Sequence, residues 1–283
     1  MNSIALERVG FTYPSSEAAA LEDVSITFEA GVVTWLYGSV GAGCTTLLLV
    51  AAGLAPRHTG GDVTGSVRVL GLDPAAAASR DALAGRVAHV SGAPALQLSG
   101  VAGSVWEEVA FAPANLGWTR DRIGAAADAA LDRLGIAGLR ERDPGTLSGG
   151  ELQRVVIAAM LAMGPDAWLL DEPGAALDRA GRAVLASLLA AEAARGAVVV
   201  VASEDADATL PVARRLVVLD RGRVALDGEP AALLAGDEVW RCGPGSTSVA
   251  ELARKAAAID PGAARGLGAP YPLDAAEGIR RWR

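Results

Sequence analysis

The stretch from Gly38 to Thr46 has the residue types of a loop that holds a phosphate group. The apolar run Val32–Tyr37 before it predicts a β-strand, and the run Thr45–Leu49 predicts a helix. In a strand–loop–helix unit of this kind, backbone N–H groups and the positive end of the helix together cradle an anion. The candidate phosphate-binding residues are Gly38, Ser39, Gly41, Gly43, Cys44, Thr45 and Thr46.

One position of this loop departs from the nucleotide-binding pattern G-x-x-x-x-G-K-[ST]. Gly38, Gly43 and Thr45 match the pattern, but Cys44 stands where the lysine belongs. The chain holds a single lysine, Lys255, and arginine carries nearly all of its positive charge. A drift from lysine to arginine would have left an arginine in the loop. The sequence therefore predicts a nucleotide-binding protein whose loop lacks the side-chain cation that normally contacts the phosphates.

A second anion-binding pattern occurs at residues 147–154, Leu-Ser-Gly-Gly-Glu-Leu-Gln-Arg, directly before the apolar helix predicted at Val155–Met163. Ser148 is a good N-cap, because its side chain accepts a hydrogen bond from the first turn of a helix. Gly149 and Gly150 leave the following N–H groups open to an anion.

Two carboxylates, Asp171 and Glu172, follow a predicted buried strand, Ala167–Leu170. Ligands of nucleotide-binding sheets bind at the carboxyl ends of the strands, and Mg²⁺ prefers oxygen ligands. We therefore expect Asp171 to be a Mg²⁺ ligand, together with the hydroxyl of Thr45. Glu172 is then the candidate general base.

Composition limits the class of protein. With 283 residues, the chain is long for one domain and short for two, which predicts one large α/β domain with an appendage. No apolar run reaches the roughly 18 residues that a transmembrane helix needs, and residues 1–8 do not resemble a secretory signal. The net charge of −8 argues against a nucleic-acid partner. Cys44 and Cys242 lack the spacing of a metal site or disulfide, so we expect a soluble intracellular protein.

The rest of the chain supplies elements around these motifs. Residues 4–35 predict short strands, and Tyr13 offers a ring that would stack on a purine; an ordinary half-buried strand residue is the alternative. Residues from about 93 to 160 predict a helical insert. Residues 229–283 predict helices, for which subunit pairing, through side chains such as Trp240, and a capping subdomain remain equal alternatives.

Taken in order, these motifs resemble those of the ATP-binding subunits of ATP-binding-cassette (ABC) transporters. Leu147–Gln153 matches the family's signature motif, Leu169–Pro173 its Walker B motif and Ala176–Asp178 its D-loop, and Tyr13 fits the adenine-stacking position. The resemblance implies an α/β fold: a P-loop NTPase core with an antiparallel β subdomain, the helical insert and a small helical C-terminal extension. It also implies a nucleotide-binding domain at 1–228, an extension at 229–283, and ATP and Mg²⁺ as cofactors.

A narrower resemblance points to energy-coupling-factor ATPases, which drive the uptake of vitamins or transition-metal ions. Residues 94–98 and 109–117 are similar to the corresponding region of that group, and Ser248–Arg254 and Pro272–Arg280 are similar to its C-terminal helices. The resemblance implies a peripheral position on the inner, cytoplasmic face of the cell membrane. It also implies two partners, a transmembrane transporter subunit and a second ABC ATPase subunit.

Three departures from the family pattern fall on one half of the nucleotide site. Besides Cys44, Gly92 stands where the Q-loop glutamine belongs, and Glu204 stands where the switch histidine belongs. A hydrogen bond to a charged group contributes about 1.5–3 kcal/mol, so losing the lysine predicts about 10- to 100-fold weaker ATP binding and a larger loss in phosphoryl transfer. Glu204 would repel a γ-phosphate and is expected to be non-functional. A thiol at a helix N-terminus tends towards a low pKa, but a neutral Cys44 that fills space is preferred over a redox sensor.

In ABC transporters two ATPase subunits pair head to tail, so each nucleotide lies between one subunit's phosphate loop and the other's signature motif. The signature residues Ser148, Gly149 and Gly150 are intact. We therefore interpret the chain as one half of a heterodimer, with a weak site of its own and a signature motif that completes its partner's site. Two alternatives remain open. One is a conventional ATPase in which another cation, such as Arg57, replaces the lysine; the other is a non-catalytic pseudo-ATPase that acts as a scaffold or regulator.

Overall fold

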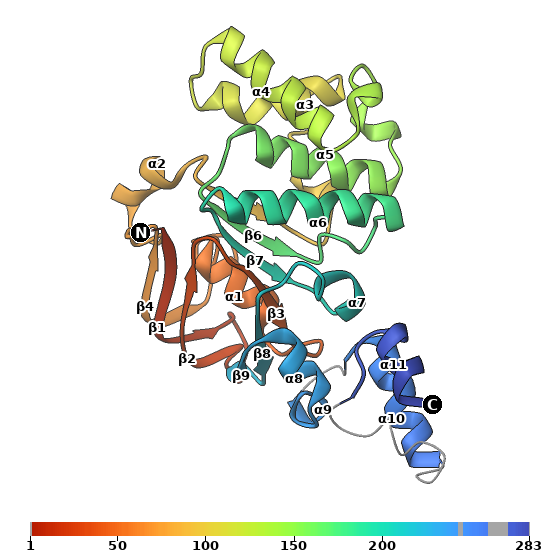
Figure 1. The fold of residues 1–283 in the computed structure, drawn as a ribbon. Coiled ribbons are helices and arrows are strands. Elements are labelled where there is room, and N and C mark those ends of the chain that lie inside the picture. The colour runs from red at the N-terminus through yellow and green to blue at the C-terminus, as the bar shows by residue number, and fades with distance from the viewer. Residues whose placement is uncertain (1, 243–245, 260–270, 283) are drawn as a thin grey trace.

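The computed structural model describes residues 2–242, 246–259 and 271–282, and two sheets form its framework (Figure 1). The antiparallel sheet has the order β2 (Leu21–Glu29), β1 (Ser3–Thr12) and β4 (Asp62–Val69). The larger sheet has the order β5 (Val87–Val90), β6 (Ala167–Asp171), β7 (Val198–Ala202), β3 (Val33–Tyr37), β8 (Arg215–Asp220) and β9 (Arg223–Gly228). Its strands are parallel except for β9. The predicted α/β core with an antiparallel β subdomain is confirmed.

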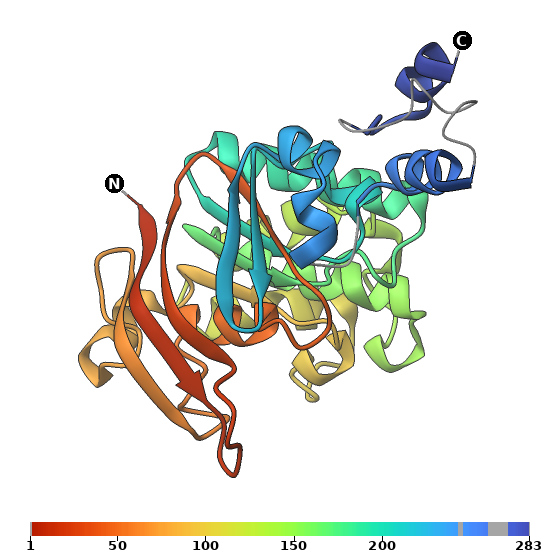
Figure 2. The same ribbon diagram turned by 90° about the horizontal axis from the view of Figure 1, so that it is seen from below.

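The helices fall into three groups. Helices α1 (Cys44–Ala51), α6 (Arg179–Ala194) and α7 (Ala206–Thr209) contribute buried side chains to the cores, whereas the short α2 (Arg80–Leu83) buries none. The helical insert consists of α3 (Val105–Asn115), α4 (Arg120–Arg133) and α5 (Gly149–Ala162), which pack on one another at one end of the molecule (Figure 1). The C-terminal extension holds α8 (Pro230–Ala235), α9 (Glu238–Cys242), α10 (Ser248–Ile259) and α11 (Ala275–Trp282). In Figure 2, α10 and α11 stand well away from the antiparallel sheet.

The central strands explain where the loops of interest meet. Strands β3, β6 and β7 carry continuous buried apolar runs, as is typical of parallel strands that are covered on both faces. Their register aligns Leu36 with Ala202, and Ala202 with Asp171. The loops that follow these three strands therefore leave the sheet at the same carboxyl edge, where sheets of this topology bind ligands.

Alternate residues of the strands build the two main cores. On β6, Trp168 and Leu170 face the core that includes α3–α6, whereas Leu169 faces the core that includes α1 and the antiparallel sheet. The larger sheet thus packs against the helical insert on one face and against α1 and the antiparallel sheet on the other. This packing on both faces fixes the loops at its carboxyl edge.

The C-terminal extension packs on the core of this chain. Leu234 on α8 and Val239 on α9 join the cluster beneath β3 and β8. The guanidinium of Arg254 lies over the ring of Trp240, with 4.6 Å between its central carbon and the centre of the ring. Ser248, at the start of α10, donates its hydroxyl to Asp207 of α7 at 2.5 Å. These contacts favour the capping role for the extension, while the domain boundaries 1–228 and 229–283 stay predictions.

Crossing a bilayer takes a long apolar helix, and none is found in the described part of the chain.

Candidate nucleotide site

The loop between β3 and α1 borders a cavity of about 360 Å³. Gly92, at the expected Q-loop position, does not line it, but the other residues that sequence reasoning assigned to this chain's own half of the site do: Tyr13, Gly38, Ser39, Gly41, Gly43, Cys44, Thr45, Thr46, Asp171, Glu172 and Glu204. They come from four separate segments of the chain. Three of these segments follow β3, β6 and β7, whose carboxyl ends meet at one edge of the sheet. Ser148, Gly149 and Gly150 lie elsewhere, at the start of α5.

The loop needs its glycines for steric reasons. Gly43 has a φ of +107°, and a Cβ there would lie 2.7 Å from the carbonyl oxygen of Ala20. A Cβ on Gly38 would lie 2.8 Å from the carbonyl oxygen of Leu219. Helix α1 begins directly after Gly43 and has no side-chain cap. Its first N–H groups therefore have no partners within the helix and are available to an anion in the cavity.

Cys44 supplies a neutral thiol to this cavity. The side chain is partly buried against apolar neighbours, and burial, reinforced by the carboxylate of Asp171, raises the pKa of the Cys44 thiol to about 12. Desolvation therefore outweighs the effect of the helix N-terminus. Among the described residues that line the cavity there is no lysine, arginine or histidine, and Arg57 is not one of them.

Glu172 is held by the segment that follows β7, residues 203–205, which we call the switch loop. One oxygen of its carboxylate accepts a hydrogen bond from the N–H of Glu204 at 2.7 Å. The other accepts from the hydroxyl of Ser203 at 3.3 Å. Burial raises the pKa of Glu172, and the neighbouring carboxylates of Glu204 and Asp171 raise it further, while these two hydrogen bonds oppose the shift. The candidate base is thus engaged by the switch loop, and its φ of 46° is unusual for a residue other than glycine.

Gly92 lies beside the two carboxylates but contributes no side chain. A Cβ at this position would lie 3.7 Å from the Cβ of Glu172 and 3.7 Å from the carbonyl oxygen of Asp171, which is ordinary van der Waals contact. The backbone would therefore accept a Cβ here without displacement of its neighbours.

The oxygen donors at the cavity suit Mg²⁺ as a hard cation. Thr45 and Asp171 both line it, and Mg²⁺ in nucleotide sites is typically held by one or two protein oxygens together with phosphate oxygens and water. No cluster of three histidine, cysteine, aspartate or glutamate side chains in the described residues could hold a metal. A Mg²⁺ ion would therefore depend on the nucleotide for most of its ligands.

Tyr13 stands at the rim of the cavity. Its hydroxyl and that of Thr46 share a hydrogen bond of 3.0 Å. Its ring meets Phe11 edge to face, with 4.8 Å between the ring centres. Tyr13 is thus held against the first turn of α1, at the rim of the cavity.

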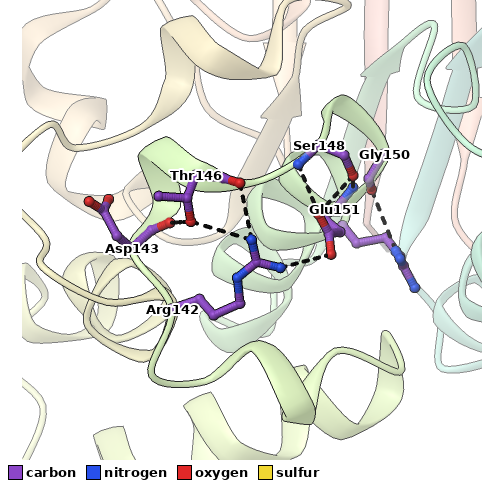
Figure 3. A network of polar contacts seen from close by, with 7 residues as sticks. Arg142, Asp143, Thr146, Ser148, Gly150 and Glu151 are labelled. Carbon is purple, nitrogen blue, oxygen red and sulfur yellow. Dashed lines mark hydrogen bonds and ion pairs between the residues drawn. The ribbon is translucent and has the colours of Figure 1, made fainter.

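The signature segment forms a separate, fully built helix start (Figure 3). Ser148 caps α5, and the carboxylate of Glu151 accepts hydrogen bonds from the N–H and the hydroxyl of Ser148, each at 2.8 Å. Arg142 donates to Glu151 at 3.3 Å and to the carbonyl oxygen of Thr146 at 3.1 Å. The hydrogen bonds from Ser148, with smaller help from Arg142, lower the pKa of Glu151, so this carboxylate stays ionised and the motif stays fixed.

Gly150 ties the signature to the D-loop. A Cβ on Gly150 would lie 2.8 Å from the carbonyl oxygen of Ala176. Only glycine permits this approach, so the start of α5 sits against the segment that follows the Walker B strand.

Sequence reasoning missed two residues of these sites, Arg142 and Ser203. The capping box Ser-x-x-Glu at Ser148–Glu151 can be found from the sequence. No local pattern predicts that Arg142 pairs with the carboxylate of Glu151 in this box. Ser203 precedes the expected switch position, and only the structure shows that its hydroxyl reaches Glu172.

Comparison with known proteins points in one direction. Residues 21–175 match the ABC transporter family. The energy-coupling factor transporter ATP-binding protein EcfA2 of Methanospirillum hungatei is 33% identical over 238 residues, which make up 84% of this chain but only 58% of that protein. A putative ABC transporter ATP-binding protein of Pyrococcus abyssi is 37% identical over 231 residues, 81% of each chain. The structure of cbiO1 from Clostridium perfringens, part of the ABC transporter complex cbiONQ, matches with a TM-score of 0.73 and 25% identity over 94% of this chain and 98% of its own.

Proposed function

Because this chain belongs to the ABC transporter family and carries its ATPase domain, we propose that it is the ATP-binding subunit of a membrane importer of the energy-coupling-factor kind, for a vitamin or a metal ion. The resemblance that the motifs predicted is thereby confirmed at the level of the family. In this proposal the chain's own nucleotide site is impaired, and its signature motif completes the ATP site of a different ATPase subunit. The pair works on the cytoplasmic face of the membrane, bound to a transmembrane subunit.

One observation carries the proposal: the departures from the family pattern cluster at the chain's own cavity. Cys44 and Glu204 line it, and a Cβ on Gly92 would lie 3.7 Å from the Cβ of Glu172. The start of α5, by contrast, keeps its cap and the glycine that its packing needs. A subunit that serves a partner's ATP needs the second region and tolerates losses in the first.

The relatives support the transport setting. The EcfA2 protein is named as part of an energy-coupling factor transporter, and cbiO1 is part of the cbiONQ complex. The chain spans little more than half of the EcfA2 protein, so the substrate and partners that we assign to this chain are part of the proposal.

The test compares the two regions in the assembled complex. The tagged chain is purified from detergent-solubilised membranes with its partners, and MgATP turnover is measured. In the proposal the hydroxyl of Ser148 contacts the partner's nucleotide when the pair assembles, so Ser148→Ala removes one donor, and losing one such donor lowers turnover by about 100-fold or more. Cys44→Ala alters only the impaired site and is expected to change turnover less than twofold.

Two controls separate chemistry from folding. Ser187→Ala, an exposed serine in the middle of α6, makes the same chemical change away from both sites. Ser148→Thr keeps both the hydroxyl and the capping ability, so it should keep most of the turnover. An equal loss in Cys44→Ala and Ser148→Ala would show that the chain's own site is catalytic, and no loss in either would favour the scaffold.

A further inference from the structure

The cavity beside the phosphate loop keeps the parts that hold two phosphates and lacks a part that holds the third. In loops of this pattern the backbone N–H groups cradle the α- and β-phosphates, and the lysine reaches the β- and γ-phosphates. Here the glycines Gly38, Gly41 and Gly43 are present and helix α1 starts without a side-chain cap. The lysine position is Cys44, so the backbone cradle remains but the side-chain contact to the β- and γ-phosphates is gone, and with it the side-chain contact to the outermost phosphate.

The lining of the cavity also contains acidic side chains. Glu172 and Glu204 follow β6 and β7, and both line the cavity. Glu172 is fixed there by the N–H of Glu204 at 2.7 Å and the hydroxyl of Ser203 at 3.3 Å. The cavity-lining residues that the structure describes include no basic side chain to offset these carboxylates.

The arginine behind the switch loop does not change this balance. Arg182 donates to Asp205 at 2.7 Å and to the carbonyl oxygen of Gly174 at 3.2 Å. It lines a second cavity, of about 340 Å³, on the other side of Glu204. Its charge is therefore directed at Asp205 and away from the phosphate-loop cavity.

We propose that the phosphate-loop cavity binds a nucleoside diphosphate with Mg²⁺ in preference to the triphosphate, and that Glu204 is the residue that selects against the third phosphate. The inference rests on the proposed function, because it concerns the same impaired site. A triphosphate adds negative charge on the side of Glu172 and Glu204. At roughly 7 Å in a water-like dielectric, each carboxylate weakens the binding of one added charge about threefold. Together they give a preference of about five- to tenfold for the diphosphate.

This selectivity gives the impaired site a role of its own. Its occupancy follows the ratio of diphosphate to triphosphate instead of a hydrolytic cycle. The site would thus report the supply of ATP to the complex while the partner's site turns over.

The test is calorimetric titration of the purified full chain, in Mg²⁺, with ADP and with ATP or its hydrolysis-resistant imido analogue. ADP is expected to bind at least fivefold more tightly than either triphosphate. Glu204→Gln keeps the size of the side chain but removes its charge, and should reduce the preference by two- to threefold. Asp132→Asn on α4, an exposed residue outside both cavities, makes the same charge change and should leave the preference unaltered.

Three results would overturn the inference: a triphosphate that binds as tightly as ADP, no binding of either nucleotide at millimolar concentration, or a preference that Glu204→Gln does not change. Its failure is distinguishable from that of the proposed function. Triphosphate preference together with a complex that depends on Ser148 overturns only this inference. ADP preference together with a complex indifferent to Ser148→Ala overturns only the proposed function.

Discussion

The phosphate-loop cavity lies at the start of α1, and the signature segment lies at the start of α5. Both helix starts are suited to anions, yet the side chains around them differ in charge. At α5, Ser148 and Glu151 cap each other and Arg142 balances the carboxylate. At α1, the N-cap is Gly43 without a side-chain bond, and the described lining of the cavity holds carboxylates but no cation. The two helix starts therefore share the backbone features that suit anions but differ in the charged side chains around them.

The comparison shows that backbone shape and charge are separable. In both regions the glycines meet steric demands, since a Cβ on Gly38 or Gly150 would lie 2.8 Å from a carbonyl oxygen. The groups that were lost at the cavity are side chains that contact phosphates, and their loss leaves the loop folded. A chain can thus keep the backbone shape of a nucleotide site while lacking side chains that contact phosphates in the family pattern.

The largest effect is expected from restoring the lost side chains together. The purified native chain should turn over MgATP slowly, and the triple variant Cys44→Lys, Gly92→Gln, Glu204→His should raise turnover by about 1000-fold, since one lost transition-state donor costs about 10²–10³ in rate. A Cβ at Gly92 would make only ordinary van der Waals contacts. In a pair of restored chains, the signature segment of one copy serves the loop of the other.

Single variants provide the control for this gain. Cys44→Lys alone should recover part of the activity, and the triple variant carrying Ser148→Ala should lose it again. Substantial turnover by the native chain would contradict the comparison, because some other cation would then have to hold the phosphates.

The next largest effect concerns the reactivity of Cys44. A pKa of about 12, compared with 9.0 for an ordinary thiol, means about 1000-fold less thiolate at neutral pH. The remaining thiolate is more nucleophilic, with a Brønsted slope of about 0.4–0.5, so alkylation by iodoacetamide at pH 7.5 should be about 30-fold slower than that of free cysteine. The measurement uses a Cys242→Ser background. The rate should keep rising with pH beyond 10, because the thiolate fraction grows until the pKa is passed. A plateau near pH 7 would indicate a reactive, sensing thiol.

The sequence predicted the framework well because its elements are locally encoded. The buried runs that became β6 and β7 are continuous stretches of apolar residues, and the start of α5 is marked by the Ser148–Glu151 capping box. The loop glycines announced both the turn and the close approach of the backbone. Patterns of this kind depend on neighbours in the chain, so one sequence suffices to find them.

The parts that resisted prediction depend on contacts across the chain. A neutral Cys44 was the preferred prediction, but its physical cause could not be found from the sequence: the raised pKa follows from burial and from Asp171, 127 positions further along the chain, and not from the helix that Cys44 begins. The hold on Glu172 comes from Ser203 and the N–H of Glu204, which lie on another strand's loop. Residue types at these positions carry no sign of such contacts.

A smaller effect is expected when the N-cap of α5 is removed. Ser148→Ala should lower the free energy of unfolding by about 1 kcal/mol, because the helix loses its cap, whereas Ser148→Gly should cost only a few tenths. Urea denaturation monitored by circular dichroism measures both. Ser187→Ala in the interior of α6 should be neutral or slightly stabilising, because alanine is the better helix former. Equal stability of Ser148→Ala and the native chain would mean that the cap contributes nothing to the fold.

The smallest expected effect concerns the hydrogen bond between Tyr13 and Thr46, which links the rim of the cavity to the first turn of α1. Tyr13→Phe keeps the ring but removes the hydroxyl that shares a 3.0 Å hydrogen bond with Thr46. A neutral hydrogen bond of this kind contributes about 0.5–1.5 kcal/mol, and because the ring still packs on Phe11, we expect the Kd for ADP to rise only two- to threefold. Tyr13→Ala removes the stacking surface as well and should weaken binding further. If both variants bound ADP as the native chain does, the nucleotide would be held by the loop alone, and the cavity would bind any molecule that presents two phosphates.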